Sequence, residues 1–249
     1  MNDSSQPRYA VYFAPPAESG LWDLAQRWLG RDCERDAMLE PPPLDGWTRE
    51  EIAAVTESPR RYGFHATLKP PFRLAPEVSL RDLHDRLTGF AAGRQAFVVP
   101  PLKVSAIGPF LALTLSQPSA EMQALADAAV TELDGLRAPL TDKELERRLG
   151  KGLTPRQEDY VRRWGYPYVF QEFRFHMTLT GPIPETERRE RLQSQLAALF
   201  RPLLGSPVPV GEICLYSQEN SERPFLLADR FRLTAAAAAA GTAEGQATP

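Results

Sequence analysis

The chain has 249 residues, of which 43% are hydrophobic and 24% charged, which is ordinary for a globular protein long enough to bury a core. Its net charge of -3 argues against a protein that holds long nucleic acids, because such proteins carry a basic surplus. The N-terminus has no signal-peptide pattern and no apolar run approaches the roughly 18 residues of a membrane span, so we expect no membrane partner and a cytoplasmic location.

The first half of the chain predicts alternating strands and helices. Ser19 and Gly30 are typical helix caps, and Thr48 with Glu51 forms a capping box. In chain order we expect a strand at 9–14, a helix between Ser19 and Gly30, a helix from Thr48 through Val55, a strand at 62–68 closed by Lys69-Pro70-Pro71, a helix opened by Ser79, two or three short strands within 97–115, and a helix at 119–133. This order indicates an α+β lobe.

The second half begins with a charged and aromatic connection at 135–171, in which Thr154 before Pro155 predicts one or two short helices and a turn. It is either a solvated linker or a lid or wall that holds a phosphate and a flat or sugar-like group. After it we expect a strand at 173–180, an amphipathic helix carrying Leu192, Leu196, Leu199 and Leu203, strands at 209–216 and 225–233, and a disordered Ala-rich tail at 235–249. The repeated order indicates a duplicated unit.

Two of the three histidines lie in one repeated frame, Phe-His-x-Thr-Leu, at 64–68 and 175–179. Because successive side chains of a strand point to opposite faces, His65 and Thr67 share one face, as do His176 and Thr178. The third histidine, His84, lies away from the apolar positions of its predicted helix, and we interpret it as a solvated residue.

The chemistry that this pair of motifs favours is acid–base catalysis on a phosphodiester. Neither motif has a second ligand at metal spacing, no Gly-x-Ser-x-Gly nucleophile turn is present, and Cys33 and Cys214 are expected to be buried thiols in a reducing compartment. One neutral imidazole can take a proton from water while the other, protonated, gives one to the leaving oxygen, and the two threonines can bind the other phosphate oxygens. We therefore expect no metal and no cofactor, and a cyclic phosphodiester whose leaving oxygen stays tethered.

The motif pair resembles the 2H phosphoesterase superfamily, whose pattern His-x-[Ser/Thr]-apolar is matched at both sites. The chain is most similar to a branch encoded in phosphonate-utilisation operons. The resemblance covers nearly the whole chain apart from the tail, and rests on Arg-Tyr-Ala-Val-Tyr-Phe-Ala-Pro-Pro at 8–16, Trp-Leu-Gly-Arg-Asp at 28–32, Arg-Arg-Tyr-Gly-Phe-His-Ala-Thr-Leu-Lys at 60–69, Gly-Leu-Thr-Pro-Arg-Gln at 152–157, Arg-Trp-Gly-Tyr-Pro-Tyr-Val at 163–169 and Glu-Phe-Arg-Phe-His-Met-Thr-Leu-Thr-Gly at 172–181.

The resemblance implies one α+β bilobal domain at 7–234, with two pseudo-symmetric lobes, each a small antiparallel sheet backed by helices, and the histidines facing each other across a groove. It implies a small phosphorylated substrate such as a ribose cyclic phosphate, and other phosphonate-pathway enzymes as partners. Basic or aromatic residues near the motifs are candidate substrate contacts, with surface charge or packing as the other interpretation: Tyr12, Arg61, Lys69, Arg156, Trp164, Tyr166 and Arg174.

Three functions are therefore open. The leading hypothesis is a metal-independent cyclic phosphodiesterase that acts on a small sugar phosphate in phosphonate catabolism. The second is hydrolysis of RNA 2′,3′-cyclic phosphates or 2′,5′-RNA ligation by the same chemistry. The third is a non-catalytic protein that binds a phosphate ligand or assists other phosphonate enzymes.

Overall fold

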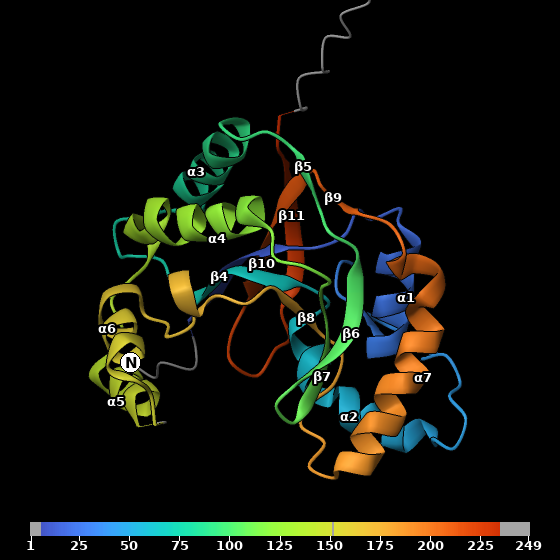
Figure 1. The fold of residues 1–249 in the computed structure, drawn as a ribbon. Helices are drawn as coiled ribbons and strands as arrows, with labels where there is room; N and C mark the ends of the chain where they lie inside the picture. The colour runs from blue at the N-terminus through green and yellow to red at the C-terminus, as the bar shows by residue number, and fades with distance from the viewer. Residues whose placement is uncertain (1–5, 151, 235–249) are drawn as a thin grey trace, which may run out of the picture.

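A seven-stranded antiparallel sheet occupies the centre of the computed structural model, which describes residues 6–150 and 152–234 (Figure 1). Its strands lie in the order β11 (Leu226–Arg232), β10 (Glu212–Gln218), β1 (Arg8–Phe13), β4 (Ala66–Phe72), β8 (His176–Thr178), β7 (Phe110–Leu115) and β6 (Leu102–Ile107). Two small strand pairs accompany it, β2 (Arg31–Asp32) with β3 (Ala37–Met38) and β5 (Phe97–Val99) with β9 (Val208–Val210). The expected α+β class is confirmed, and the tail expected at 235–249 lies outside the described residues.

Helices surround this sheet (Figure 1). The α-helices are α1 (Gly20–Leu29), α2 (Arg49–Tyr62), α3 (Leu80–Ala92), α4 (Ala120–Glu132), α5 (Asp142–Leu149), α6 (Pro155–Trp164) and α7 (Thr186–Leu204), and short 3-10 turns form η2 (Asp134–Leu136) and η3 (Phe170–Glu172). α1 contacts α2 and α7, while α4 contacts β4 and α3 contacts β11. The connection expected to hold short helices contains α5 and α6, which contact each other. Within the described residues, no helix is both long and apolar enough to cross a membrane.

Local capping signals explain why several helices begin and end where the sequence predicts. The Ser19 hydroxyl accepts a hydrogen bond from the Trp22 amide, and Gly30 ends α1 with a φ of 78° in the left-handed region. Thr48 and Glu51 form the expected capping box at the start of α2. These contacts span only a few residues, so the sequence alone identifies them.

Two parts of the sheet, β11-β10-β1-β4 and β8-β7-β6, meet at a narrow seam, and each part contains strands from both halves of the chain. β4 and β8 are joined by one residue pair, Ala66 with Met177, and both side chains are fully buried. The lobes implied by the resemblance, each with its own small sheet, are therefore connected into one continuous sheet. The seam lies at the centre of the two His-x-Thr motifs.

The helix expected to end at Val55 continues to Tyr62, so the first motif strand begins later than predicted, at Ala66. Pro59 lies inside this helix and has no N–H to donate to the carbonyl four residues earlier, that of Val55. That carbonyl instead accepts a 2.6 Å hydrogen bond from the amide of Gly181, directly after the second motif strand. The proline thus leaves an acceptor that ties one motif region to the other.

The prolines expected to close the first motif strand lie within it. β4 includes Pro70 and Pro71, and its pairing with β1 shifts register on both sides of Val11. Such irregularity accommodates residues without an N–H, because the ladder is interrupted there. The second motif strand is shorter than predicted, at three residues, and the hairpin of β2 and β3 was not expected.

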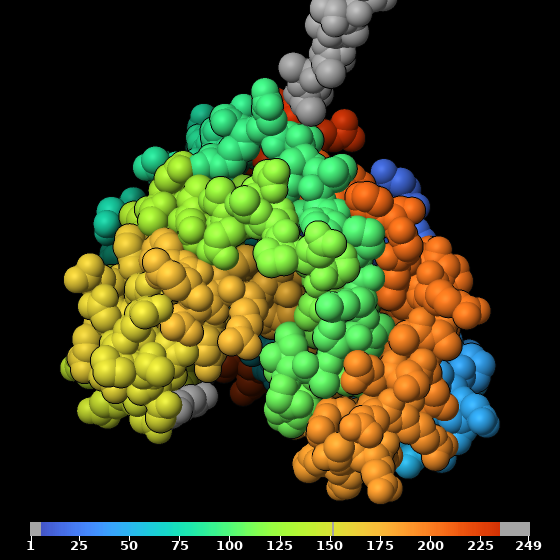
Figure 2. All heavy atoms as spheres, in the orientation of Figure 1, coloured from blue at the N-terminus to red at the C-terminus, as the bar shows by residue number. Residues whose placement is uncertain are grey.

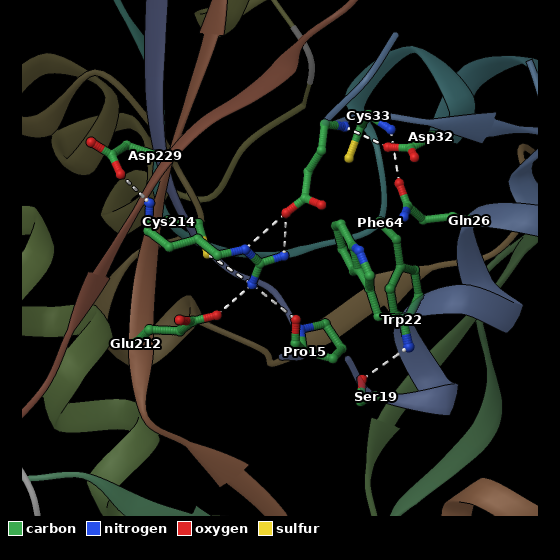
Figure 3. A network of polar contacts seen from close by, with 12 residues as sticks. Pro15, Ser19, Trp22, Gln26, Asp32, Cys33, Phe64, Glu212, Cys214 and Asp229 are labelled. Carbon is green, nitrogen blue, oxygen red and sulfur yellow. Dashed lines mark hydrogen bonds and ion pairs between the residues drawn. The ribbon is translucent and has the colours of Figure 1, made fainter. Parts of the chain in front are cut away.

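A half-buried arginine, Arg230, fixes the end of β1 against β10 and β11. The guanidinium of Arg230 pairs with Glu34 at 2.8 Å and with Glu212, and donates to the Pro15 carbonyl at 3.0 Å (Figure 3). It also lies 5.0 Å from the ring centre of Trp22. This network holds the chain just after β1, the strand that supports the first motif.

The two cysteines are free and buried, as predicted. Burial raises the pKa of Cys33 to about 11 and that of Cys214 to about 12. Both thiols are therefore protonated at neutral pH.

Candidate active site

The register at the seam relates the two motifs by a local two-fold pattern. Because Ala66 pairs with Met177 in an antiparallel sense, continuing this register by one residue on each side places His65 opposite Thr178 and Thr67 opposite His176. All four side chains then lie on one face of the sheet, since they alternate with the buried central pair. The two histidines are diagonal neighbours, a relation that separates side-chain origins by about 7–8 Å.

Both imidazoles are oriented by the same backbone contact. Nδ1 of His65 lies 3.0 Å from the carbonyl oxygen of Gly63, and Nδ1 of His176 lies 2.7 Å from that of Arg174. A carbonyl oxygen only accepts, so the ring nitrogen donates in each case and carries the proton. The neutral tautomer therefore leaves Nε2 as the free acceptor on both rings, and a protonated ring presents an Nε2–H donor.

Burial makes His65 a neutral base at ordinary pH. Desolvation, together with the charge of His176, lowers its pKa to about 4, although the Gly63 carbonyl opposes the shift. The ring stacks on Tyr12, with centroids 3.7 Å apart and planes 14° apart. The ring centroid of Tyr62 lies 6.5 Å from that of His65. The first imidazole thus packs against aromatic rings and remains partly accessible to solvent.

The second imidazole opens into a cavity of about 450 Å³ beside the seam. The surface is hollowed between the segment that contains α5 and α6 and the hairpin of β6 and β7 (Figure 2). Aromatic and apolar groups dominate the wall, and the lining residues are Thr67, Leu68, Pro70, Ile107, Phe110, Ala126, Val130, Gln157, Tyr166, Tyr168, Val169, Phe170, Glu172, Phe173, Arg174 and His176. A cavity of this size is in the range of small-molecule sites.

The candidate contacts named from the sequence are distributed over several positions. Tyr166 and Arg174 line the cavity with His176 and Thr67, and Tyr12 lies buried behind His65. The remaining candidates do not line this cavity: Lys69, Trp164, Arg61 and Arg156.

Lys69 and Trp164 line a second, narrower cleft next to the first. The Lys69 side chain is 2% exposed, and its ammonium donates to the Val130 carbonyl and pairs with Asp134 at 3.1 Å. Burial lowers its pKa to about 8. The charge of Lys69 is thus already engaged within the protein.

Arg61 and Arg156 are exposed. The Arg61 guanidinium donates to the Ser221 carbonyl, and Arg156 lies 3.9 Å from a carboxylate oxygen of Glu172, which lines the cavity. Neither arginine lines the cavity itself.

Sequence reasoning did not single out two aromatic residues of the cavity wall, Phe110 and Phe170. Phe110 follows the Gly108-Pro109 turn and its ring lies 6.0 Å from that of His176. Phe170 has a positive φ of 53°, which is rare for a bulky residue and typical of functional sites. No signal in the sequence predicts that backbone conformation.

No group of three or more His, Cys, Asp and Glu side chains in residues 6–150 and 152–234 is arranged to hold a metal ion.

Comparison with known proteins identifies a family and several relatives. A family profile described as "Protein of unknown function (DUF1045)" matches residues 67–226. The chain is 34% identical over 232 residues to a ribose 1,5-bisphosphate phosphokinase PhnN of Janthinobacterium sp. (strain Marseille), which covers 91% of this chain and 51% of that protein. It is 37% identical over 202 residues to the protein of the same name from Laribacter hongkongensis (strain HLHK9), covering 80% and 47%. The chain thus spans about half the length of these curated relatives.

Solved structures with some similarity include E. coli LigT complexed with 3′-AMP, with 15% identity, a TM-score of 0.41 and coverage of 92% of this chain and 98% of that one. A second is E. coli LigT complexed with NADP+, with 16% identity, a TM-score of 0.42 and coverage of 93% and 99%.

Proposed function

This chain belongs to the DUF1045 family of proteins of unknown function, whose profile covers more than half of it, and we propose that it is a metal-independent cyclic phosphodiesterase of the 2H phosphoesterase type. His65 and His176 form the acid–base pair. The observation that supports this most strongly is the pairing of Ala66 with Met177, which brings the two motifs side by side in the sheet, with Nδ1 of each ring held by a backbone carbonyl. Thr67 and His176 line the cavity, while His65 and Thr178 are not among its lining residues.

The reaction divides the proton transfers between the two rings. Neutral His65, whose pKa is lowered to about 4, takes the proton of a water molecule through Nε2 as the water oxygen attacks phosphorus. Protonated His176 gives its Nε2 proton to the leaving oxygen as the P–O bond breaks. The product is a phosphomonoester with a free hydroxyl, and exchange with solvent returns each ring to its starting protonation state.

The threonines stabilise the charge that develops on phosphorus. If the register of Ala66 with Met177 continues by one residue on each side, Thr67 and Thr178 each lie opposite the histidine of the other motif, and their hydroxyls can donate to the non-bridging oxygens of a phosphate held between the rings. Removing such a donor typically costs about 10²–10³ in kcat.

The substrate proposed first is a ribose cyclic phosphate in phosphonate catabolism, with other enzymes of that pathway as partners. The name of the relatives supports a phosphorylated ribose. Their phosphokinase activity is not proposed for this chain, which spans about half their length and lacks the G-x-x-x-x-G-K-[ST] loop that many phosphokinases use.

A test of this proposal replaces each histidine by asparagine, whose amide can still donate to the backbone carbonyl while Nε2 is lost. We expect His65→Asn and His176→Asn each to lower kcat for a ribose cyclic phosphate by about 10²–10⁴ in EDTA. His84→Asn is the matched control, because that ring is exposed and pairs with Asp229. Turnover that survives both motif substitutions, or binding of the cyclic phosphate without any turnover by the wild type, overturns the proposal.

A second candidate is hydrolysis of nucleoside or RNA-terminal 2′,3′-cyclic phosphates, or 2′,5′-RNA ligation. The aromatic wall of the cavity favours it, because a flat base can stack there and a bare sugar phosphate has no apolar face to bury. The net charge of -3 favours a short ligand over long RNA. Comparing kcat/KM for ribose cyclic phosphate, a nucleoside 2′,3′-cyclic phosphate and an oligonucleotide that ends in one distinguishes the two candidates.

A further inference from the structure

A second cleft next to the candidate active site is lined mainly by cationic side chains. It shares Pro70 with the cavity at His176, and its charged lining residues are Arg8, Lys69, Arg73, Arg137, Arg148 and Glu144. One carboxylate among six charged groups is an unusual balance for a protein whose net charge is -3.

Three of these cations have carboxylate partners. Arg73 pairs with Glu144 at 2.7 Å. Lys69 and Arg137 share Asp134, at 3.1 Å and 2.9 Å. These pairs account for the positive charge at the inner part of the cleft.

Arg8 and Arg148 have only neutral acceptors among the described residues. The Arg8 guanidinium donates to the amide oxygen of Gln218 at 2.8 Å, and that of Arg148 donates to the Gly165 carbonyl. Both side chains are half-buried. Both guanidinium groups line the same cleft, and the planar fork of donors on each suits a phosphate.

Arg8 and Arg148 line the same cleft, and the positive charge of Arg8 acts unfavourably on the charged form of Arg148. Burial is the main cause of the lowered pKa of Arg148, and the charge of Arg8 adds to it, while Glu144 acts in the opposite direction. A bound dianion would relieve this repulsion.

The contacts that link Arg8 and Arg148 to the two histidines indicate how far apart two phosphate groups of one ligand would lie. The Arg8 guanidinium lies 5.5 Å from the ring centre of Phe225, which stacks on Tyr62 at 5.4 Å, and Tyr62 lies 6.5 Å from His65. On the other side, Arg148 holds the residue before Tyr166, which lines the cavity at His176. Aromatic rings thus connect Arg8 to His65, and the arginine cleft and the cavity at His176 are separate pockets that share Pro70. We therefore expect a phosphate at the arginines to be a different group from the one at the histidines.

We propose that Arg8 and Arg148 bind a second phosphate of the substrate, a phosphomonoester carried by the same sugar as the cyclic phosphodiester. This rests on the proposed function, which supplies the cyclic group at the histidines. The enclosed part of the cleft is about 20 Å³, room for about one water molecule. The phosphate therefore binds at the mouth of the cleft, between the two guanidinium groups.

The experiment measures binding of ribose 5-phosphate and of ribose by calorimetry, so that it does not depend on turnover. We expect the wild type to bind ribose 5-phosphate in preference to ribose, and Arg8→Gln and Arg148→Gln each to weaken that binding tenfold or more. Arg147→Gln is the matched control, because Arg147 is the exposed neighbour on the same helix, and it should bind as the wild type does. Arg148→Lys should recover part of the affinity, since it keeps the charge but not the fork. Thermal unfolding checks that each variant is folded, and the two arginine variants test the site independently.

The same titrations in His65→Asn and His176→Asn identify where the phosphate binds. If the affinity for ribose 5-phosphate persists in the two histidine variants, the result supports the arginine site. If that affinity is lost in the histidine variants but unchanged in Arg8→Gln and Arg148→Gln, the arginine site is refuted. The two proposals fail separately. Arginine-dependent binding without hydrolysis of any cyclic phosphodiester refutes the proposed function alone, while hydrolysis with equal affinity for ribose and ribose 5-phosphate refutes the second phosphate site alone.

Discussion

Replacing His65 by asparagine should change how the stability of the protein depends on pH. The folded-state pKa of His65 is about 4, against an ordinary value of 6.5. As the pH falls between these values, the unfolded chain binds a proton that the folded chain does not, so folding becomes less favourable. The stabilising contribution of neutral His65 is thus present above pH 6.5 and is lost as the pH falls towards 4.

The size of the effect follows from the shift. At about 1.4 kcal/mol per unit, a change from 6.5 to about 4 corresponds to about 3 kcal/mol in total, of which about 2 kcal/mol is lost between pH 7 and pH 5. His65→Asn cannot titrate, and its amide can keep the donation to the Gly63 carbonyl. The free energy of unfolding of the wild type should therefore fall by about 2 kcal/mol more than that of the variant over this range.

Urea unfolding at pH 7, 6 and 5, followed by circular dichroism, measures this difference. Other groups that titrate in acid contribute equally to both proteins and cancel in the comparison. His65→Gln is a second variant that cannot titrate at this position, and it should show the same reduced pH dependence as His65→Asn. Equal pH dependence of the wild type and His65→Asn would refute the claim that burial holds this ring neutral.

Three further outcomes test other parts of the structure. In urea titrations, Gly63→Ala should lower the free energy of unfolding by about 1–3 kcal/mol more than Gly108→Ala does. Both glycines have a positive φ, but only at Gly63 would an added Cβ lie 2.8 Å from Sγ of Cys33. Equal losses of stability in the two variants would exclude this clash. Glu212→Gln should lower the free energy of unfolding by about 1–3 kcal/mol in the same assay, because it removes a charged partner of half-buried Arg230. An unchanged midpoint would contradict the role of that network. The kcat/KM profile on a hydrolysed cyclic phosphodiester should have its acidic limb near pH 4, and a limb near pH 6.5 would exclude the first-motif histidine as the base.

Elements with local signals could be predicted from the sequence. Ser19, Gly30 and the Thr48–Glu51 box act over a few residues, and α1 has the predicted limits while α2 starts where its box predicts. The predicted limits of an element are wrong where a contact with a distant part of the chain decides where that element ends. Pro59 remains inside a helix because the acceptor that it frees is used by Gly181, far along the chain.

In the candidate site, too, features set by local sequence could be predicted and features set by long-range contacts could not. Strand alternation predicts from sequence that each histidine shares a face with its threonine, and the repeat indicates that the two motifs belong together. That His65 lies opposite Thr178 follows from the pairing of Ala66 with Met177, a long-range contact that no local pattern encodes. The positive φ of Phe170 likewise depends on tertiary packing.

The seam between Ala66 and Met177 also allows the two motifs to differ. In a homodimer built around the same two-fold axis, both histidines would have identical surroundings and would compete for the same protonation state. Here one chain supplies both, and the rings that flank them are unlike: Tyr12 stacks closely on His65, while Phe110 lies tilted beside His176. Because one polypeptide carries both motifs, the residues that surround His65 can differ from those that surround His176. The two histidines are therefore related by symmetry in position but differ in their chemical surroundings before any ligand binds.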